Sequence, residues 1–195
     1  VGAYESPGQN PSMRFWLFAG HRTATPAYGG VWWQTDGSWN GQNARFNAGD
    51  FNGDGVSDIV GTYEYPGQNP SLRMWLFSGH RTATPAYGGV WWQTDGSWSG
   101  LNTRIISGDV NGDAITDLVG VYNYPGQNPA FRLWMFAGHR TVTPTVGGVW
   151  WWQTDGSWSG KLSRFVAGDF NGDGIDDIVG AYEYPGQNPS MRFWL

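Results

Sequence analysis

The sequence predicts an all-β fold of β-propeller blades, each a four-stranded antiparallel sheet of about 60 residues, with an incomplete ring in one chain. One observation is a unit that recurs every 59 or 60 residues, beginning at Val1, Val60, Val119 and Val179. Another is the composition: 14 tryptophans and 31 glycines among 195 residues, with only 14% charged residues, are typical of turn-rich β-structure. Each unit also divides into short β-branched and aromatic runs separated by turn signals.

The repeat indicates one domain. We expect residues 1–195 to form a single array with units at 1–59, 60–118 and 119–178 and a partial unit at 179–195. The third unit is longer by one tryptophan, in the run Val149-Trp150-Trp151-Trp152. A β-solenoid uses shorter units and a β-trefoil a different strand count, so both fit less well than a propeller.

One unit contains four strand signals in order. The predicted strands are 45–51, 58–65, 72–77 and 89–94. The first runs into an acidic loop, and the second is rich in β-branched and aromatic residues. Pro66-Gly67 is a turn signal, and the third strand after it has the near-continuous apolar character of a sheet packed on both faces. Asp95-Gly96 is a tight-turn dipeptide that ends the fourth strand.

On this interpretation the chain starts in the second strand of one blade and stops in the third strand of another. Residues 1–17 and 179–195 are identical except for Ser6 against Tyr184. About four blades are needed to close a propeller. We therefore expect a homo-oligomer that completes a ring of about six to eight blades; the alternative is that the chain is cut from a longer array.

An acidic loop of the pattern Asp-x-Asn-x-Asp-Gly-x-x-Asp follows the first predicted strand. Oxygen side chains at alternate positions of a tight loop converge on one centre, and oxygen-only donors suit calcium better than zinc or copper. We predict about one structural Ca²⁺ per full repeat. The predicted ligands are Asp50, Asn52, Asp54 and Asp58; Asp109, Asn111, Asp113 and Asp117; and Asp169, Asn171, Asp173 and Asp177.

Two considerations limit the calcium interpretation. These loops are also compatible with Asx-rich turns that hold no ion. In the second copy Ala114 replaces the glycine at position 6, where a Cβ strains a left-handed backbone by about 1 kcal/mol. We therefore expect weaker metal binding at that loop.

The loops and their flanks, RFVAGDFNGDGIDDIVGAY in the third copy, resemble the FG-GAP/VCBS repeats of integrin α-subunit propellers and many secreted bacterial proteins. The run Gly-Ser-Trp, a few residues, Arg and then Gly-Asp-x-Asn-Gly-Asp is also similar to fungal PVL-type propeller lectins. The resemblance covers every full repeat. It implies blade architecture and calcium held by the loop acids, and it is much less specific for function.

Aromatic rings near loops predict a carbohydrate site, because indole faces stack on pyranose rings. The predicted ligand-binding tryptophans are Trp39, Trp98 and Trp158. Mid-strand tryptophans, such as Trp75, are expected in the core. Within pairs such as Trp91-Trp92, neighbouring rings are expected on opposite faces of the sheet. Packing is the alternative role for each of these side chains.

Two further repeated motifs carry polar groups suited to a glycan. Pro-Gly-Gln-Asn-Pro occurs four times, and Gln68 and Asn69 are candidate hydrogen-bonding residues, with a plain hairpin turn as the alternative. Gly-His-Arg-Thr offers a cation for an acidic sugar or carboxylate, with a surface loop as the alternative. Its candidate residues are His21, Arg22, His80, Arg81, His139 and Arg140.

The sequence favours a calcium-stabilised propeller that binds carbohydrate multivalently. The alternative is a structural or protein-adhesion module, or an engineered repeat scaffold without a ligand. We expect no enzymatic activity, because no nucleophile–base constellation stands outside the loops. The net charge of -5 includes no basic stripe for nucleic acid, and no apolar run approaches a membrane span. Calcium loops weakly favour a secreted, extracellular protein.

Overall fold

The computed structural model describes most of the chain. The described residues are 2–5, 13–19, 27–35, 37–79, 86–94, 96, 98–124, 126–127, 131–138, 149–154, 158, 162–187 and 191–195.

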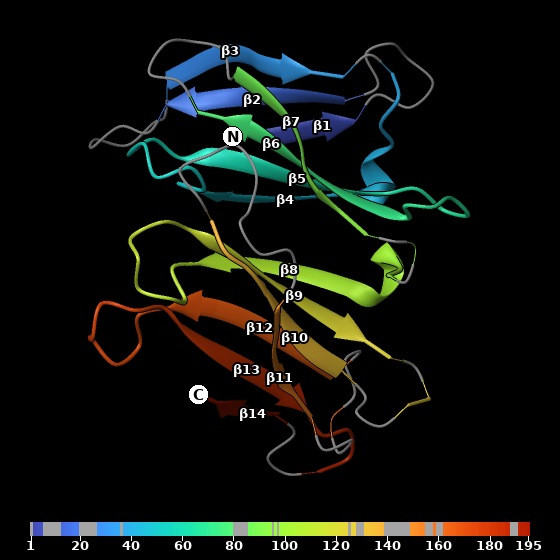
Figure 1. The fold of residues 1–195 in the computed structure, drawn as a ribbon, viewed down its shortest axis with the longest axis vertical. Helices are drawn as coiled ribbons and strands as arrows, with labels where there is room; N and C mark the ends of the chain where they lie inside the picture. The colour runs from blue at the N-terminus through green and yellow to red at the C-terminus, as the bar shows by residue number, and fades with distance from the viewer. Residues whose placement is uncertain are drawn as a thin grey trace.

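The described strands form four antiparallel sheets that follow one another in chain order (Figure 1). The first sheet contains β1 (Gly2–Glu5), β2 (Met13–Ala19) and β3 (Ala27–Gln34). The second contains β4 (Ala44–Gly49), β5 (Asp58–Glu64), β6 (Leu72–Ser78) and β7 (Ala86–Gln93). The third contains β8 (Thr103–Gly108), β9 (Asp117–Asn123), β10 (Phe131–Phe136) and β11 (Val149–Gln153). The fourth contains β12 (Ser163–Gly168), β13 (Asp177–Glu183) and β14 (Met191–Trp194).

This topology confirms the predicted fold class, an all-β array of four-stranded antiparallel blades. Within each sheet the strands pair in sequence order, so every blade is a simple meander. Short 3-10 turns, η1 (Gly41–Asn43) and η2 (Gly100–Asn102), lead into the first strands of the second and third sheets. By repeat position, the described strands of the first sheet are strands two to four of a blade, and those of the fourth sheet are strands one to three. The predicted strand positions at the two chain termini are thus confirmed.

The first strands of successive blades lie beside one another. Asn47 in β4 donates its side-chain N–H to the carbonyl of Ile105 in β8 (3.3 Å). Ser107 in β8 donates to the carbonyl of Ala48 (3.2 Å), and Arg104 donates to the carbonyl of Ser163 in β12. The sheets are therefore linked along β4, β8 and β12.

The core lies between the sheets rather than on one side of each. Every residue of β5 is buried, as expected of a strand covered on both faces. Successive sheets are separated by apolar clusters, and the cluster between the second and third sheets includes Phe51, Met74, Trp98 and Phe136. Face-to-face packing therefore makes each blade depend on its neighbour for stability.

Paired tryptophans in the fourth strands depart from the expected alternation. A register shift opposite Met74 and Trp75 leaves Trp91 between the paired positions of β7. Trp91 and Trp92 consequently pack against the same cluster between sheets, instead of on opposite faces. The prediction of opposite faces was wrong because a β-bulge adds a residue and rotates the local strand.

Candidate functional site

In each of the first two acidic loops, the last aspartate points inward and accepts backbone N–H groups. Asp58 is fully buried, and its two oxygens accept N–H bonds from Phe51 (3.0 Å) and Gly79 (2.7 Å). Burial is the largest influence on this carboxyl and raises its pKa to about 6, although the two N–H bonds act in the opposite direction. Asp117 is buried in the same way, and its pKa is likewise raised to about 6 by burial.

The outer oxygens of the loop accept backbone N–H groups of the same loop. Asp50 accepts from Asp54 (3.0 Å) and Gly55 (2.7 Å). Asn52 also accepts from Asp54 (2.9 Å), and the Asp54 carboxylate accepts from Val56 (2.8 Å). The bonds accepted by Asn52 and Asp54 come from the residue two positions on and are Asx turns, and all four bonds fix the loop conformation.

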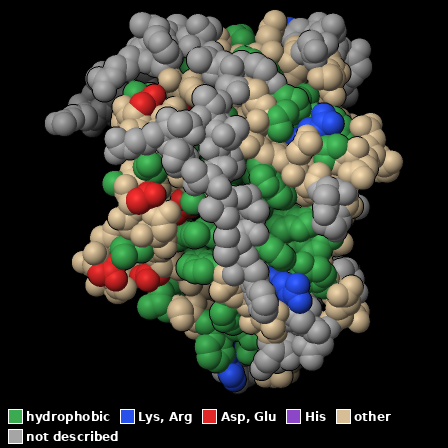
Figure 2. Space-filling model, viewed as in Figure 1, with side chains coloured by type: hydrophobic (Ala, Val, Ile, Leu, Met, Phe, Trp, Pro, Cys, Tyr) green, Lys and Arg blue, Asp and Glu red, His purple; other side chains and the backbone are tan. Residues whose placement is uncertain are grey.

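The predicted calcium ligands are oxygen donors, the type that calcium prefers. All three loops, 50–58, 109–117 and 169–177, lie within the described residues. In that part of the chain, no group of three or more Asp, Glu, His or Cys side chains is placed to hold a metal ion. Calcium binding by these loops therefore stays a prediction. Figure 2 shows acidic side chains along one edge of the molecule, where Figure 1 places the loops.

Ala114 adopts the left-handed backbone that the sequence predicted to be strained. Its φ is 63°, and the equivalent Gly55 and Gly174 have φ values of 81° and 87°. We expect Ala114→Gly to raise the free energy of unfolding by about 1 kcal/mol, because glycine adopts this region without a Cβ clash. Urea unfolding measures the change, and Gly55→Ala is the reciprocal control, with a loss of similar size expected. A destabilised Ala114→Gly variant would contradict the strain.

Two of the three predicted sugar-stacking tryptophans are core residues. Trp39 and Trp98 are only 7% and 8% exposed. The Trp98 ring lies 4.9 Å from Tyr122 and 5.9 Å from Phe136 between ring centroids. Both side chains therefore have the packing role that was the alternative to sugar binding, because the neighbouring blade covers the faces of their rings. The third candidate, Trp158, is half-buried and lines a pocket described below.

The remaining candidates are placed only in part. Gln68 and Asn69 are exposed in a turn, and the backbone N–H of Gln68 donates to the carbonyl of Tyr65 (3.1 Å), as the hairpin alternative expects. A ligand role for these two amides is untested. The histidine–arginine candidates lie outside the described residues: His21, Arg22, His80, Arg81, His139 and Arg140.

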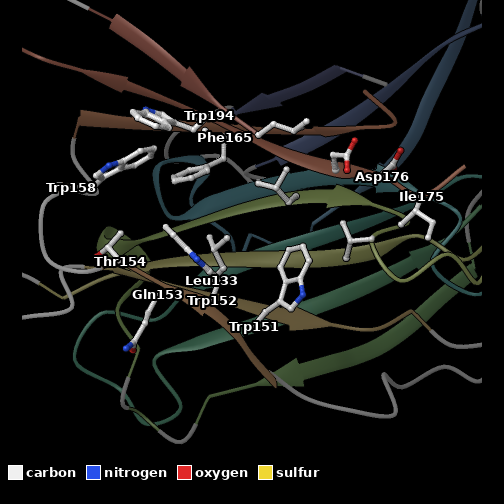
Figure 3. A pocket seen from close by; sticks show the side chains of 15 residues that line it. Leu133, Trp151, Trp152, Gln153, Thr154, Trp158, Phe165, Ile175, Asp176 and Trp194 are labelled. Carbon is white, nitrogen blue, oxygen red and sulfur yellow. The ribbon is translucent and has the colours of Figure 1, made fainter. Parts of the chain in front are cut away.

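A pocket of about 830 Å³ lies between the third and fourth sheets. In Figure 3, Trp158 and Trp194 lie at one end, Trp151 lies towards Asp176 at the other, and Trp152 lies between the two ends. Trp151, Trp152 and Trp194 are 43%, 48% and 47% exposed. The pocket therefore presents indole surfaces to solvent, whereas the other described interfaces between sheets bury theirs.

Trp151 is more exposed than its equivalent in the second repeat. The equivalent Trp91 is 2% exposed and contacts the ring of Phe51 at 5.9 Å. In the third repeat Val110 takes the place of Phe51, and it lines the pocket. Val110 in place of Phe51 is a difference between these two repeats that the sequence shows at the pocket.

Asp176 supplies a carboxylate to the pocket where the other repeats have a hydroxyl. Its Oδ2 accepts the backbone N–H of Asp109 (2.9 Å), as the Thr116 hydroxyl accepts that of Asp50 (3.0 Å). The other repeat has Ser57 at this position. Among the described residues Oδ1 of Asp176 accepts no bond, so it is available to a ligand donor.

Thr154 adds a buried hydroxyl to the lining. Its side chain is 4% exposed, and its Oγ1 has no hydrogen-bond partner in the described part of the chain. By contrast, the hydroxyls of Thr35 and Thr94 accept backbone N–H groups of Met13 and Leu72. Among the described residues, the Thr154 hydroxyl therefore lacks the backbone N–H donor that its equivalents have.

Comparison with known proteins identifies the fold. No family model and no curated protein matches the chain. A solved structure of an Agrocybe aegerita lectin, described for specific recognition of non-reducing terminal N-acetylglucosamine, matches with a TM-score of 0.52 and 15% identity. The match covers 95% of this chain and 46% of that chain, so this protein spans less than half the length of the lectin. The two share a fold. The resemblance to FG-GAP/VCBS repeats is not tested by this match.

The structure also bears on membrane association. Among the described residues, no helix has the length and apolar character that a membrane span requires.

Proposed function

We propose that the protein is a carbohydrate-binding module whose ligand occupies the pocket between the third and fourth sheets. The observation that carries this proposal is the exposed Trp151 indole towards Asp176 in a pocket of about 830 Å³. An indole face offers an apolar platform for the C–H groups of a pyranose, and a carboxylate accepts its hydroxyl protons. The fold shared with a lectin supports this assignment and makes N-acetylglucosamine the first sugar to test.

The proposal is tested by isothermal titration calorimetry, in which N-acetylglucosamine is titrated into the protein and the dissociation constant is measured. Trp151→Ala removes the platform and is expected to abolish measurable binding. Asp176→Thr keeps an acceptor for the Asp109 N–H, as Thr116 does for Asp50, and is expected to weaken binding about tenfold.

The matched control is Glu183→Thr, an exposed acid on β13 that does not line the pocket. Its affinity should equal that of the unmodified protein. A panel of sugars without any binding contradicts the proposal and favours the scaffold alternative. Binding that survives both pocket substitutions places the sugar elsewhere and also contradicts it.

As part of the same proposal, several copies of the chain assemble to complete a propeller ring. The equivalent tryptophans of the other interfaces, Trp32 and Trp91, are buried, so one chain does not repeat this pocket among its described residues. Multivalent binding then comes from several chains in one assembly, each with one pocket. Native mass spectrometry measures the number of subunits, and a monomer at high concentration contradicts assembly.

Calcium stabilisation of the assembly is a separate proposal. Its support is the oxygen-only donor set of the three loops. The expected result is a higher melting temperature in millimolar calcium than in chelator, measured by circular dichroism. Equal melting temperatures would mean that the Asx turns alone hold the loops.

A further inference from the structure

A second, smaller cavity lies between the second and third sheets and shares no lining residue with the pocket described above. Its volume is about 10 Å³, which is about the room that one water molecule needs. Its lining includes Arg45, Thr62 and Glu64 of the second sheet, with Gly100 in η2 and Thr103 in β8 beside them. The cavity is therefore polar, although an apolar cluster forms the core of the same interface.

Strand β5 directs two polar side chains into this cavity. Thr62 and Glu64 are two residues apart, so they project from the same face of the strand. Thr62 pairs with Met74 in β6, and Met74 belongs to the cluster between the second and third sheets. The two polar side chains therefore face the third sheet, where they are only 3% and 8% exposed.

Both side chains have hydrogen-bonding capacity left inside the protein. In the described part of the chain, Oγ1 of Thr62 has no hydrogen-bond partner. Oε1 of Glu64 accepts the Ser99 hydroxyl (3.2 Å) and the Gly100 N–H (3.0 Å), whereas Oε2 accepts no bond from a described residue. A buried hydroxyl is destabilising unless it is paired, so a further polar group is required here.

Arg45 places additional donors at the wall of the cavity. It is the direct partner of Thr62 in the register of β4 and β5. Its Nη1 donates to the carbonyls of Gln42 (3.0 Å) and Ala44 (2.8 Å), and these bonds fix the guanidinium beside the cavity. A guanidinium carries five N–H groups, so donors beyond these two bonds remain.

We propose that this cavity is a binding site for one internal water molecule. The water donates to Oε2 of Glu64 and accepts the Thr62 hydroxyl proton, with an Arg45 N–H as its third partner. Glu64 is itself bonded to Ser99 and Gly100, which lie at the start of the next blade. The water therefore extends a polar link between two blades across an otherwise apolar interface.

The other repeats provide a matched substitution for this site. The positions equivalent to Thr62 carry no hydroxyl, since they are Ala3, Val121 and Ala181. Val121 is 2% exposed, so the same strand position accommodates a buried valine. Thr62→Val therefore removes the hydroxyl while it keeps the shape of the side chain. Thr62→Ser keeps the hydroxyl and is the conservative variant.

Crystal structures of the protein and of these two variants at about 1.5 Å resolution test the proposal. In the unmodified protein we expect one density peak within about 2.5–3.2 Å of both Thr62 Oγ1 and Glu64 Oε2. Thr62→Ser should keep this peak, and Thr62→Val should lose it or reduce its occupancy at least about twofold.

Three outcomes would overturn the proposal. One is the absence of a peak in the unmodified protein. Another is a peak of equal occupancy in Thr62→Val, which would mean that the hydroxyl does not hold the water. The third is a peak surrounded by six or more oxygens at about 2.4 Å, because that geometry belongs to a cation such as calcium.

Discussion

Replacing Trp98 by alanine is expected to lower the free energy of unfolding by about 3–5 kcal/mol. The ring is 8% exposed and packs against Trp92, Tyr122 and Phe136 across the interface between the second and third sheets. Truncation removes its burial and leaves a cavity that these rigid rings cannot fill. Urea denaturation followed by circular dichroism measures the loss.

Trp152→Ala is the matched control, because this tryptophan is 48% exposed and lines an open pocket. Its expected cost is below about 1 kcal/mol. Trp152→Ala should weaken sugar binding, because Trp152 lines the pocket. Trp98→Ala should leave sugar affinity unchanged, because Trp98 does not line the pocket. Equal destabilisation by the two substitutions would contradict the division into packing and pocket tryptophans.

Asp58→Asn is expected to cost about 2–3 kcal/mol of unfolding free energy. The buried carboxylate accepts N–H bonds from Phe51 and Gly79 with different oxygens. An amide has only one acceptor oxygen, so its NH₂ group faces one of these donors and leaves a buried N–H unpaired. Thermal and urea unfolding, each in chelator and in calcium, measure the effect.

Two equivalent positions provide the comparison for this substitution. Asp117→Asn should cost a similar amount, because Asp117 is also fully buried and accepts from Val110 and Gly138. Asp177→Asn should cost less, since Asp177 is half-buried and water can reach the loop. A loss that appears at all three positions in calcium and disappears in chelator would assign the carboxylates to a metal instead.

The order of the strands could be predicted from the sequence because each signal is local. The repeat spacing, the Pro66-Gly67 turn and the β-branched runs depend on neighbouring residues, and the four sheets follow them. The left-handed backbone at Ala114 was likewise predictable from its glycine equivalents. Local sequence signals were therefore sufficient to predict the strand order within a blade.

The exposure of individual tryptophans was not predictable in this way. Trp39 and Trp98 follow a turn signal, which suggests a loop, but the adjacent blade buries them. Trp151 is 43% exposed, although its equivalent Trp91 in the second repeat is 2% exposed. A bulge in the fourth strands also overrides the alternation of side chains. These features depend on contacts between blades, which a repeat pattern alone does not specify.

The most direct test of a carbohydrate pocket among packed tryptophans is an NMR titration that follows the indole N–H signals. Addition of N-acetylglucosamine is expected to shift the signals of Trp151 and Trp152 and to leave those of Trp39 and Trp98 unchanged. No shift at saturating sugar, or shifts at Trp39 and Trp98 without any at Trp151, would contradict the account.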